Sequence, residues 1–160
     1  ILNTKINCTL THIGEDFHQG EIQKKVIEMG LTDKVKFVGL IANDKLPEYY
    51  HDADILLHTS LYESQAVVVN EAMASGLLVC GTRVGLLADL TDTCCLTVNP
   101  GDAEGLAEIV LRLISDTSMI SKIRKNAYEW STAHDLKWTV QQHRAVYELT
   151  SDKRGINNLK

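Results

Sequence analysis

Residues 53–85 read ADILLHTSLYESQAVVVNEAMASGLLVCGTRVG, and two apolar runs enclose a longer segment in this stretch. Residues 53–57 and 77–80 are short and continuously apolar, which is typical of parallel strands buried on both faces. Residues 67–75 between them have the length of a helix, and Gly76 follows as a helix stop. A strand, a helix and a second strand in this order predict a parallel βαβ unit.

The same alternation continues on both sides of this unit. Apolar runs predict strands at residues 6–13 and 35–38 before it and at residues 95–98 after it. We expect helices at residues 21–29, 44–51 (with Asn43 as the cap), from 102 onward, 118–131 and 137–149. Together these elements predict an α/β fold: a Rossmann-like, doubly wound parallel sheet with a helical C-terminal extension.

Size and charge restrict the classes of protein that fit. A chain of 160 residues suits one domain, and 44% apolar with 23% charged residues excludes a disordered chain. The net charge of −5 argues against nucleic-acid binding, which needs a basic face. No apolar run approaches the ~20 residues of a transmembrane helix. We expect one domain over residues 1–150 and a polar tail over residues 151–160.

Cysteines and histidines supply no metal-binding pattern. The four cysteines show no C-x-x-C spacing, so we expect free thiols and a reducing compartment, the cytoplasm. The six histidines form no H-x3-H pair and no H-E-x-x-H motif. His58 ends a strand near the expected ligand side, where either a packed or a ligand-facing role is open.

In a doubly wound sheet, ligands bind beyond the carboxyl ends of the strands. The helix that starts near Ala66 turns its first, unpaired amides and its positive dipole end toward that edge, which suits a phosphate. Glu63 lies in the loop before this helix and is placed to accept hydrogen bonds from hydroxyls. Glu71 follows within the helix, where a carboxylate can bind a vicinal diol. By this rule the residues that matter lie at 14–16, 39–41, 58–63 and 81–85.

Glu63 and Glu71 enclose seven residues, and Glu71–Gly76 reads EAMASG. This pattern resembles the E-x7-E motif of family 4 glycosyltransferases, which have the GT-B fold. VKFVG at residues 35–39 is similar to V-x-F-x-G of the same family, and residues 100–102 resemble the segment after the motif. The resemblance spans residues 7–147 and implies the donor-binding, C-terminal half of such an enzyme.

The resemblance implies a role for each matching position. Glu63, the catalytic candidate, would contact the donor sugar, and Glu71 would bind the ribose. Backbone groups of Ala66, Val67 and Val68 would hold the sugar and the diphosphate. The nucleotide base would lie against Gly39, Leu40 and Ile41. The family uses no metal and no cofactor, because the nucleotide diphosphate sugar is itself the substrate.

The implied reaction is transfer of a sugar, with retention, to a hydroxyl acceptor, in cell-surface polysaccharide or lipopolysaccharide biosynthesis. A saccharide or lipid-linked acceptor would bind an N-terminal domain. The implied location is the cytoplasm, at the inner face of the membrane, with peripheral association of the parent enzyme only. Two alternatives stay open: a non-catalytic nucleotide-sugar-binding subunit, and a nucleotide-sugar epimerase of GT-B type.

This chain departs from the family pattern at several places: Thr59-Ser60 replaces Pro-Ser, and Gly85-Leu86 with Asp89 replaces Gly-Gly followed by Glu. Ser64-Gln65-Ala66 replaces the usual Gly-Phe-Gly. The family's diphosphate-binding Arg and Lys have no match, and Arg83 is the nearby cation. We therefore expect this chain to start after the first strand and helix of the domain. That strand is central in the order 3-2-1-4-5-6. The strands at 6–13, 35–38 and 53–57 would each lose a neighbour on one side, and upstream residues or an exchanged or intermolecular contact would fill the gap. The alternative is that the five strands close directly, with 6–13 beside 53–57.

Overall fold

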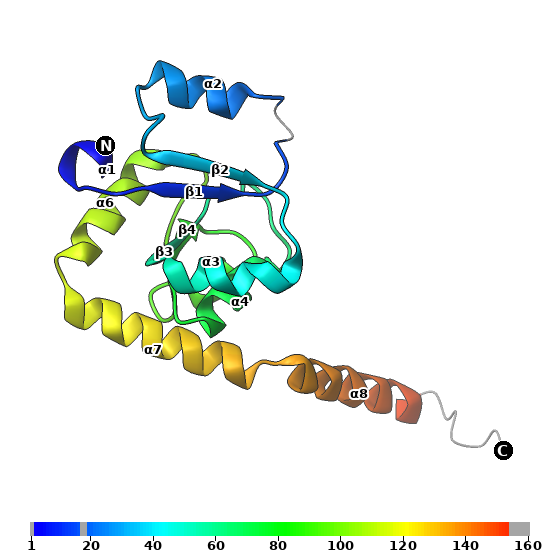
Figure 1. Ribbon diagram of the computed structural model, residues 1–160. Coiled ribbons are helices and arrows are strands. Elements are labelled where there is room, and N and C mark those ends of the chain that lie inside the picture. Colours follow the sequence, from blue (N-terminus) through cyan, green and yellow to red (C-terminus); the bar gives the residue numbers. More distant parts are fainter. Residues whose placement is uncertain (1, 17–18, 154–160) are drawn as a thin grey trace.

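The computed structural model describes residues 2–16 and 19–153 and confirms the parallel α/β architecture (Figure 1). Helices and strands alternate through the first two thirds of these residues, and three helices end them. In chain order the elements are α1 (Leu2–Lys5), β1 (Leu10–Ile13), α2 (Glu21–Glu28), β2 (Val35–Gly39), the 3-10 turn η1 (Asn43–Lys45), α3 (Leu46–Asp52), β3 (Ile55–His58), α4 (Val67–Ala74), β4 (Leu78–Thr82), α5 (Leu86–Leu90), β5 (Leu96–Val98), α6 (Ala103–Ile114), α7 (Thr117–Ala133) and α8 (Leu136–Lys153).

The five strands fall into two separate parallel sheets. β1 pairs with β2, from Leu10 opposite Val35 onward, and β4 lies between β3 and β5. No described strand lies between β1 and β3, which are the edges of their sheets. Since β1 and β3 do not pair with each other, direct closure of the five strands is wrong for the described residues. That a strand is lost between them, and what would fill the gap, stay predictions.

The three-stranded sheet carries the core. Every residue of β4 and β5 is buried, and alternate β4 side chains enter opposite layers. Val79 packs in one layer with α4 residues and Ala127 of α7. Leu78 and Cys80 pack in the other layer with the apolar stripe of α6. A sheet covered on both faces explains why these strands read as continuous apolar runs.

The first part of the chain is packed much less tightly. None of the residues of β1, β2 or α2 is buried, and Leu10 on β1 is 46% exposed. Ile27 of α2 is exposed, and so is Met29, which follows the end of that helix. The two-stranded sheet therefore lacks the cover that parallel sheets normally have on both faces.

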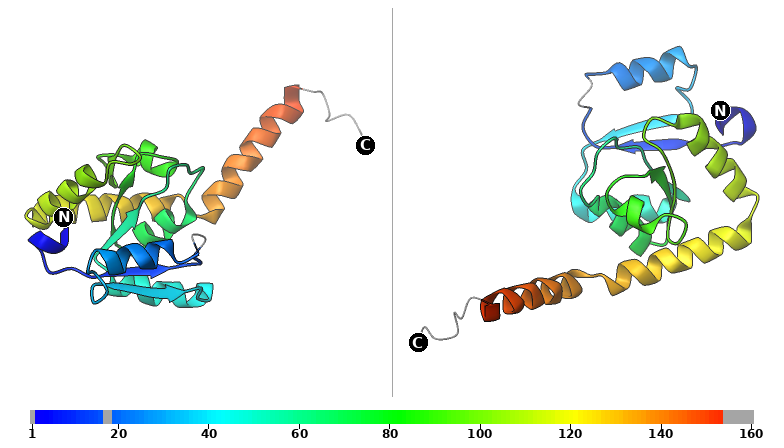
Figure 2. Two further views of the ribbon diagram at one scale, coloured as in Figure 1. Left: turned by 90° about the horizontal axis from the view of Figure 1, so that it is seen from above. Right: turned by 180° about the vertical axis from the view of Figure 1, so that it is seen from behind.

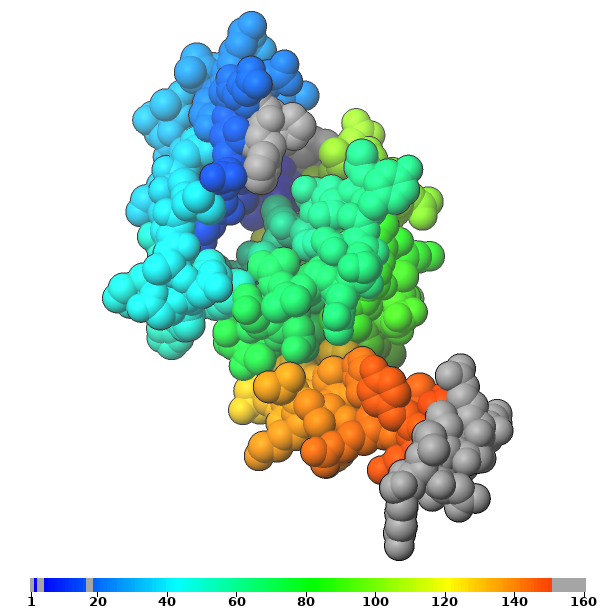
Figure 3. Space-filling view, turned by 90° about the vertical axis from the view of Figure 1, so that its right-hand side faces the viewer, coloured from blue at the N-terminus to red at the C-terminus, as the bar shows by residue number. Residues whose placement is uncertain are grey.

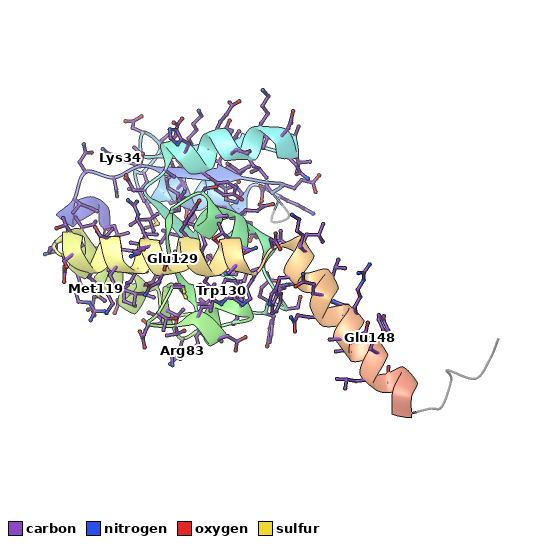
Figure 4. All side chains as sticks on the ribbon, turned by 90° about the horizontal axis from the view of Figure 1, so that it is seen from below. Lys34, Arg83, Met119, Glu129, Trp130 and Glu148 are labelled. Carbon is purple, nitrogen blue, oxygen red and sulfur yellow. The ribbon has the colours of Figure 1, made fainter. Side chains whose placement is uncertain are left out.

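Two long helices follow α6. Side chains of Asp102 and Asp116 cap α6 and α7 by accepting bonds from the amides of Gly105 and Met119. α7 packs on α4, whereas α8 extends away from the body (Figure 2). At their junction Trp130, shown in Figure 4, stacks on His134 with 4.1 Å between ring centroids, and it also packs on the core.

Several local expectations need correction. The strand predicted at residues 6–13 pairs only from Leu10, since its partner β2 begins at Val35. Asn43 opens a 3-10 turn instead of capping the next helix, which starts at Leu46 with Pro47 in its first turn. The pattern did not indicate α5, a five-residue helix held by burial of two leucines. α8 continues to Lys153 into the expected polar tail, and residues 154–160 lie outside the described part.

Candidate nucleotide-sugar site

The loop after β3 is tied to the end of β4. The Thr82 hydroxyl donates to the carbonyl of Ser60, and Gly81 lies so close to β3 that a Cβ there would be 2.3 Å from the His58 carbonyl oxygen. His58 itself is 8% exposed. These contacts place the residues that follow β3 at the carboxyl edge of the three-stranded sheet, where such folds bind ligands.

Glu63 is held by contacts from three sides. Its carboxylate Oε2 lies 3.7 Å from Nε2 of His58, and Oε1 accepts a 3.1 Å bond from the Ser64 amide. Gly85, with φ +49°, approaches the Glu63 backbone so closely that a Cβ would lie 2.9 Å from the carbonyl oxygen. The side chain stays 29% exposed. The sequence left a packed or a ligand-facing role open for His58. In the structure its side chain is buried and contacts Glu63.

The start of α4 is accessible and carries no side-chain cap. Ala66 precedes the helix in the left-handed conformation, with φ 57° and ψ 73°. Val67 and Val68, the first two helical residues, are 65% and 37% exposed. Their amides have no partner within the helix and point along its positive end. An exposed, uncapped helix start suits an anionic group. That Ala66, Val67 and Val68 bind one stays a prediction.

Glu71 lies further along α4 and is paired with α3. The buried Tyr50 hydroxyl donates a 2.9 Å hydrogen bond to Oε2 of Glu71, whose side chain is exposed. Burial, and then the hydrogen bond to Glu71 and its charge, raise the pKa of Tyr50 far above its ordinary value. The phenol therefore stays a donor. It fixes one carboxylate oxygen and leaves Oε1 for a ligand.

A cavity of about 270 Å³ lies at the carboxyl ends of the other sheet. Gly39 and Leu40, two of the three residues predicted for the nucleotide base, line it, but Ile41 does not. The remaining lining residues come from β1, the loop after it, α2 and β2: His12, Gly14, Glu15, Asp16, Gln23 and Phe37. Residues 14–16 were predicted because they follow the end of a strand. His12 and Phe37, whose ring centroids are 5.5 Å apart, were not predicted because they lie within the strands.

The predicted site residues come from two parts of the fold. Glu63, the α4 start and Glu71 lie along one loop and helix, whereas Gly39 ends β2 of the two-stranded sheet and Leu40 follows it. That Glu63 and Glu71 open onto a common cleft stays a prediction. Arg83, the cation near the expected diphosphate, donates from Nε to the Thr97 hydroxyl of β5, 3.2 Å away. Figure 4 shows it on the side of the molecule opposite Lys34.

The cysteines and the other side chains of the described residues form no cluster that suits a metal ion. Cys8, Cys80, Cys94 and Cys95 are free thiols. Burial raises the pKa of Cys80 and of Cys95 to about 12, so both are neutral packing residues. Within residues 2–16 and 19–153, no cluster of three His, Cys, Asp or Glu side chains suits a metal ion. None of the helices in the same residues is long and apolar enough to span a membrane.

Comparison with known proteins identifies the family. The sequence pattern of the family described as Glycosyl transferases group 1 matches residues 1–116. The chain belongs to the group 1 glycosyl transferases. A 2-deoxystreptamine glucosyltransferase of Streptomyces kanamyceticus is 31% identical over 76% of this chain and 32% of its own length. The N-acetyl-alpha-D-glucosaminyl L-malate synthase of Bacillus anthracis is 29% identical over 95% of this chain and 41% of its own.

Solved structures of GT-B glycosyltransferases show the same fold. Sucrose-phosphate synthase of Thermosynechococcus elongatus superimposes with a TM-score of 0.79 at 29% identity, over 91% of this chain and 39% of that one. The Anabaena protein HepE, solved with UDP, gives 0.80 at 24% identity, over 93% and 43%. This group 1 chain thus spans roughly a third to two fifths of the relatives compared. The resemblance to glycosyltransferases seen in the sequence is confirmed.

Proposed function

We propose that this chain is the donor-binding part of a retaining glycosyltransferase that takes a nucleotide diphosphate sugar. The observation that carries the proposal is the exposed, uncapped start of α4 with a glutamate on either side of it. A helix start stabilises negative charge, which a diphosphate brings and which increases as the sugar leaves. Both carboxylates are accessible and keep lone pairs that can accept from hydroxyl groups.

In this proposal each element has one task. Glu63, held by His58 and the Ser64 amide, accepts hydrogen bonds from the donor sugar. Glu71, held by Tyr50, accepts them from the ribose. The amides of Val67 and Val68 take the diphosphate, and Gly39, Leu40 and Ile41 lie beside the base. The chemistry needs positioning and stabilisation of a leaving group, and no metal enters it.

The names of relatives support the wider setting. An O-antigen chain mannosyltransferase of Escherichia coli and a lipopolysaccharide core mannosyltransferase of Rhizobium meliloti match 73% and 45% of this chain. We propose the same setting here: transfer to a saccharide or lipid-linked acceptor during assembly of cell-surface polysaccharide, in the cytoplasm, with any membrane association peripheral. A second domain would bind the acceptor.

Calorimetric titration with nucleotides and nucleotide sugars tests the donor roles. Glu71→Gln should weaken binding of both ligand types by roughly 10- to 100-fold, because hydrogen bonds to a charged group contribute about 1.5–3 kcal/mol. Glu63→Gln should weaken binding of the nucleotide sugar only, since the free nucleotide lacks the donor sugar that Glu63 would contact. Glu129→Gln on α7 is the control and should bind as the parent does.

Two results would contradict the proposal. One is unchanged binding of every nucleotide sugar by Glu71→Gln. The other is equal loss of nucleotide and nucleotide sugar in Glu63→Gln, which would assign Glu63 to the nucleotide. With an acceptor present, product analysis separates transfer of the sugar from its isomerisation by an epimerase.

A further inference from the structure

The cavity of the two-stranded sheet contains a polar atom that has no partner in the fold. Gln23 of α2, the helix beside this sheet in Figure 1, is one of the lining residues. Oε1 of its side-chain amide is buried and finds no hydrogen-bond donor in the described part of the chain. A buried carbonyl oxygen without a donor costs free energy, because it has lost its contact with water. Such an atom therefore calls for a donor from outside the chain.

Two aromatic rings line the same cavity. His12 of β1 and Phe37 of β2 lie opposite each other in the sheet, with 5.5 Å between ring centroids and 47° between ring planes. Aromatic side chains stack on nucleobases, and they do so with any base, because every base has a π-face. These rings can therefore hold the face of a base but do not select which base binds.

Selection between bases then depends on the polar side chains of the lining. Glu15 is exposed, so water competes with any ligand for its carboxylate. The Asp16 carboxylate accepts a hydrogen bond from the Gly20 amide, which ties the loop after β1 to the start of α2. Gln23 differs from both, because its Oε1 is buried and lacks a donor. It is the lining side chain whose hydrogen bonding a bound base would change most.

We propose that Gln23 selects the nucleotide base, with Oε1 accepting a hydrogen bond from an N–H group on the Watson–Crick edge of the base. The inference rests on the proposed function, because it assigns the cavity to the base of the nucleotide that Glu63 and Glu71 would hold. It adds a residue of α2, a helix that has no part in the proposed function. A site built around a hydrogen bond rejects ligands that lack the matching group. The ligand class is therefore a nucleoside diphosphate whose base places an N–H group against Gln23.

Calorimetric titration of the native polypeptide with UDP, GDP, ADP and CDP tests this selection. The four dissociation constants should span at least about tenfold, since bases that leave the buried acceptor unpaired bind more weakly. Gln23→Leu should weaken the best of the four by about 5- to 100-fold and bring all four within about threefold of one another. Gln23→Glu keeps an acceptor oxygen and should keep the order of preference. Gln141→Leu, on the exposed surface of α8, is the matched control and should bind as the parent does.

Methylation of the preferred nucleotide at its donor nitrogen removes the same hydrogen bond from the ligand. The methylated nucleotide should bind the parent at least about tenfold more weakly than the unmodified one. In Gln23→Ala, which lacks the acceptor and leaves room for the methyl group, methylation should cost less than about threefold. An equal loss in the parent and in Gln23→Ala would place the donor nitrogen against another residue and overturn the proposal.

The outcomes separate this proposal from the proposed function. If the native polypeptide binds none of the four nucleotides, the proposed function fails and the role of Gln23 fails with it. If it binds them, and Gln23→Leu keeps the same order and spread of dissociation constants, the proposed function stands and the role of Gln23 is refuted. A Gln23→Leu variant that unfolds at a higher temperature and binds all four nucleotides unchanged would likewise refute it, since water alone would then pair with Oε1.

Discussion

Replacing Tyr50 by Phe tests how the Glu71 carboxylate is held. The substitution removes the hydroxyl that donates the 2.9 Å bond and leaves the buried ring in place, so no cavity forms. A hydrogen bond to a charged group contributes about 1.5–3 kcal/mol. Because Glu71 is exposed, water can replace the lost donor at its carboxylate, so the lost stability should lie near the lower end of this range. We expect about 1–2 kcal/mol of lost stability.

Urea unfolding followed by fluorescence of Trp130 and Trp138 measures this loss. Tyr49→Phe is the matched control, since the neighbouring side chain is half-buried and no hydrogen bond of its hydroxyl is found in the described part of the chain. In a Glu71→Gln background, Tyr50→Phe should cost less than half as much, because the charged acceptor is gone. Equal losses in both backgrounds would refute the reasoning, as would a Tyr50→Phe variant as stable as the parent.

A glycine substitution and a change of pH give two further tests. Gly85→Ala should lower the free energy of unfolding by at least about 2 kcal/mol and weaken nucleotide-sugar binding. Its φ is positive, and the new Cβ would press on the Glu63 carbonyl. Gly101→Ala, also at a positive φ but with open space around it, is the control and should cost about 1 kcal/mol in the same urea unfolding experiment. Alkaline pH should lower the free energy of unfolding. Cys80 and Cys95 have a pKa of about 12 in the folded chain and about 9 in the unfolded chain. The stability that each neutral thiol contributes is therefore complete below pH 9 and declines above it, by about 1–2 kcal/mol per thiol at pH 10. A flat profile from pH 8 to 10, or one that Cys80→Ala leaves unaltered, would contradict that assignment.

Local patterns predicted the elements well where one pattern decides them. The strand predicted at residues 77–80 is β4, Leu78–Thr82, which is buried because a continuous apolar run is stable only between two covered faces. It extends two residues into the predicted loop at 81–85. Gly76, in the left-handed conformation, follows α4 as expected of a glycine after a helix. α5 escaped prediction, because five residues carry no periodicity and only the burial of Leu87 and Leu90 holds that helix.

The candidate site divides along the same line. Glu63, Glu71 and the start of α4 were found because they lie within 12 residues of one another, where the order of strand, loop and helix places them at one sheet edge. Their partners Tyr50 and His58 were not assigned to them, since a hydrogen bond between helices, or a side chain that folds back from a strand end, depends on how the elements pack.

The division of the strands shows most clearly what folding adds. The repeat of strand and helix predicts parallel pairing, because each crossover returns the chain in the same direction. β5 is buried, whereas an opening separates the segment that holds β1 and β2 from the green segment in Figure 3. This difference depends on which helices pack on which strands, and α5 and α6 pack on β4 and β5. Side-chain contacts between distant segments decide such coverage, and a periodic pattern along one segment carries no record of them.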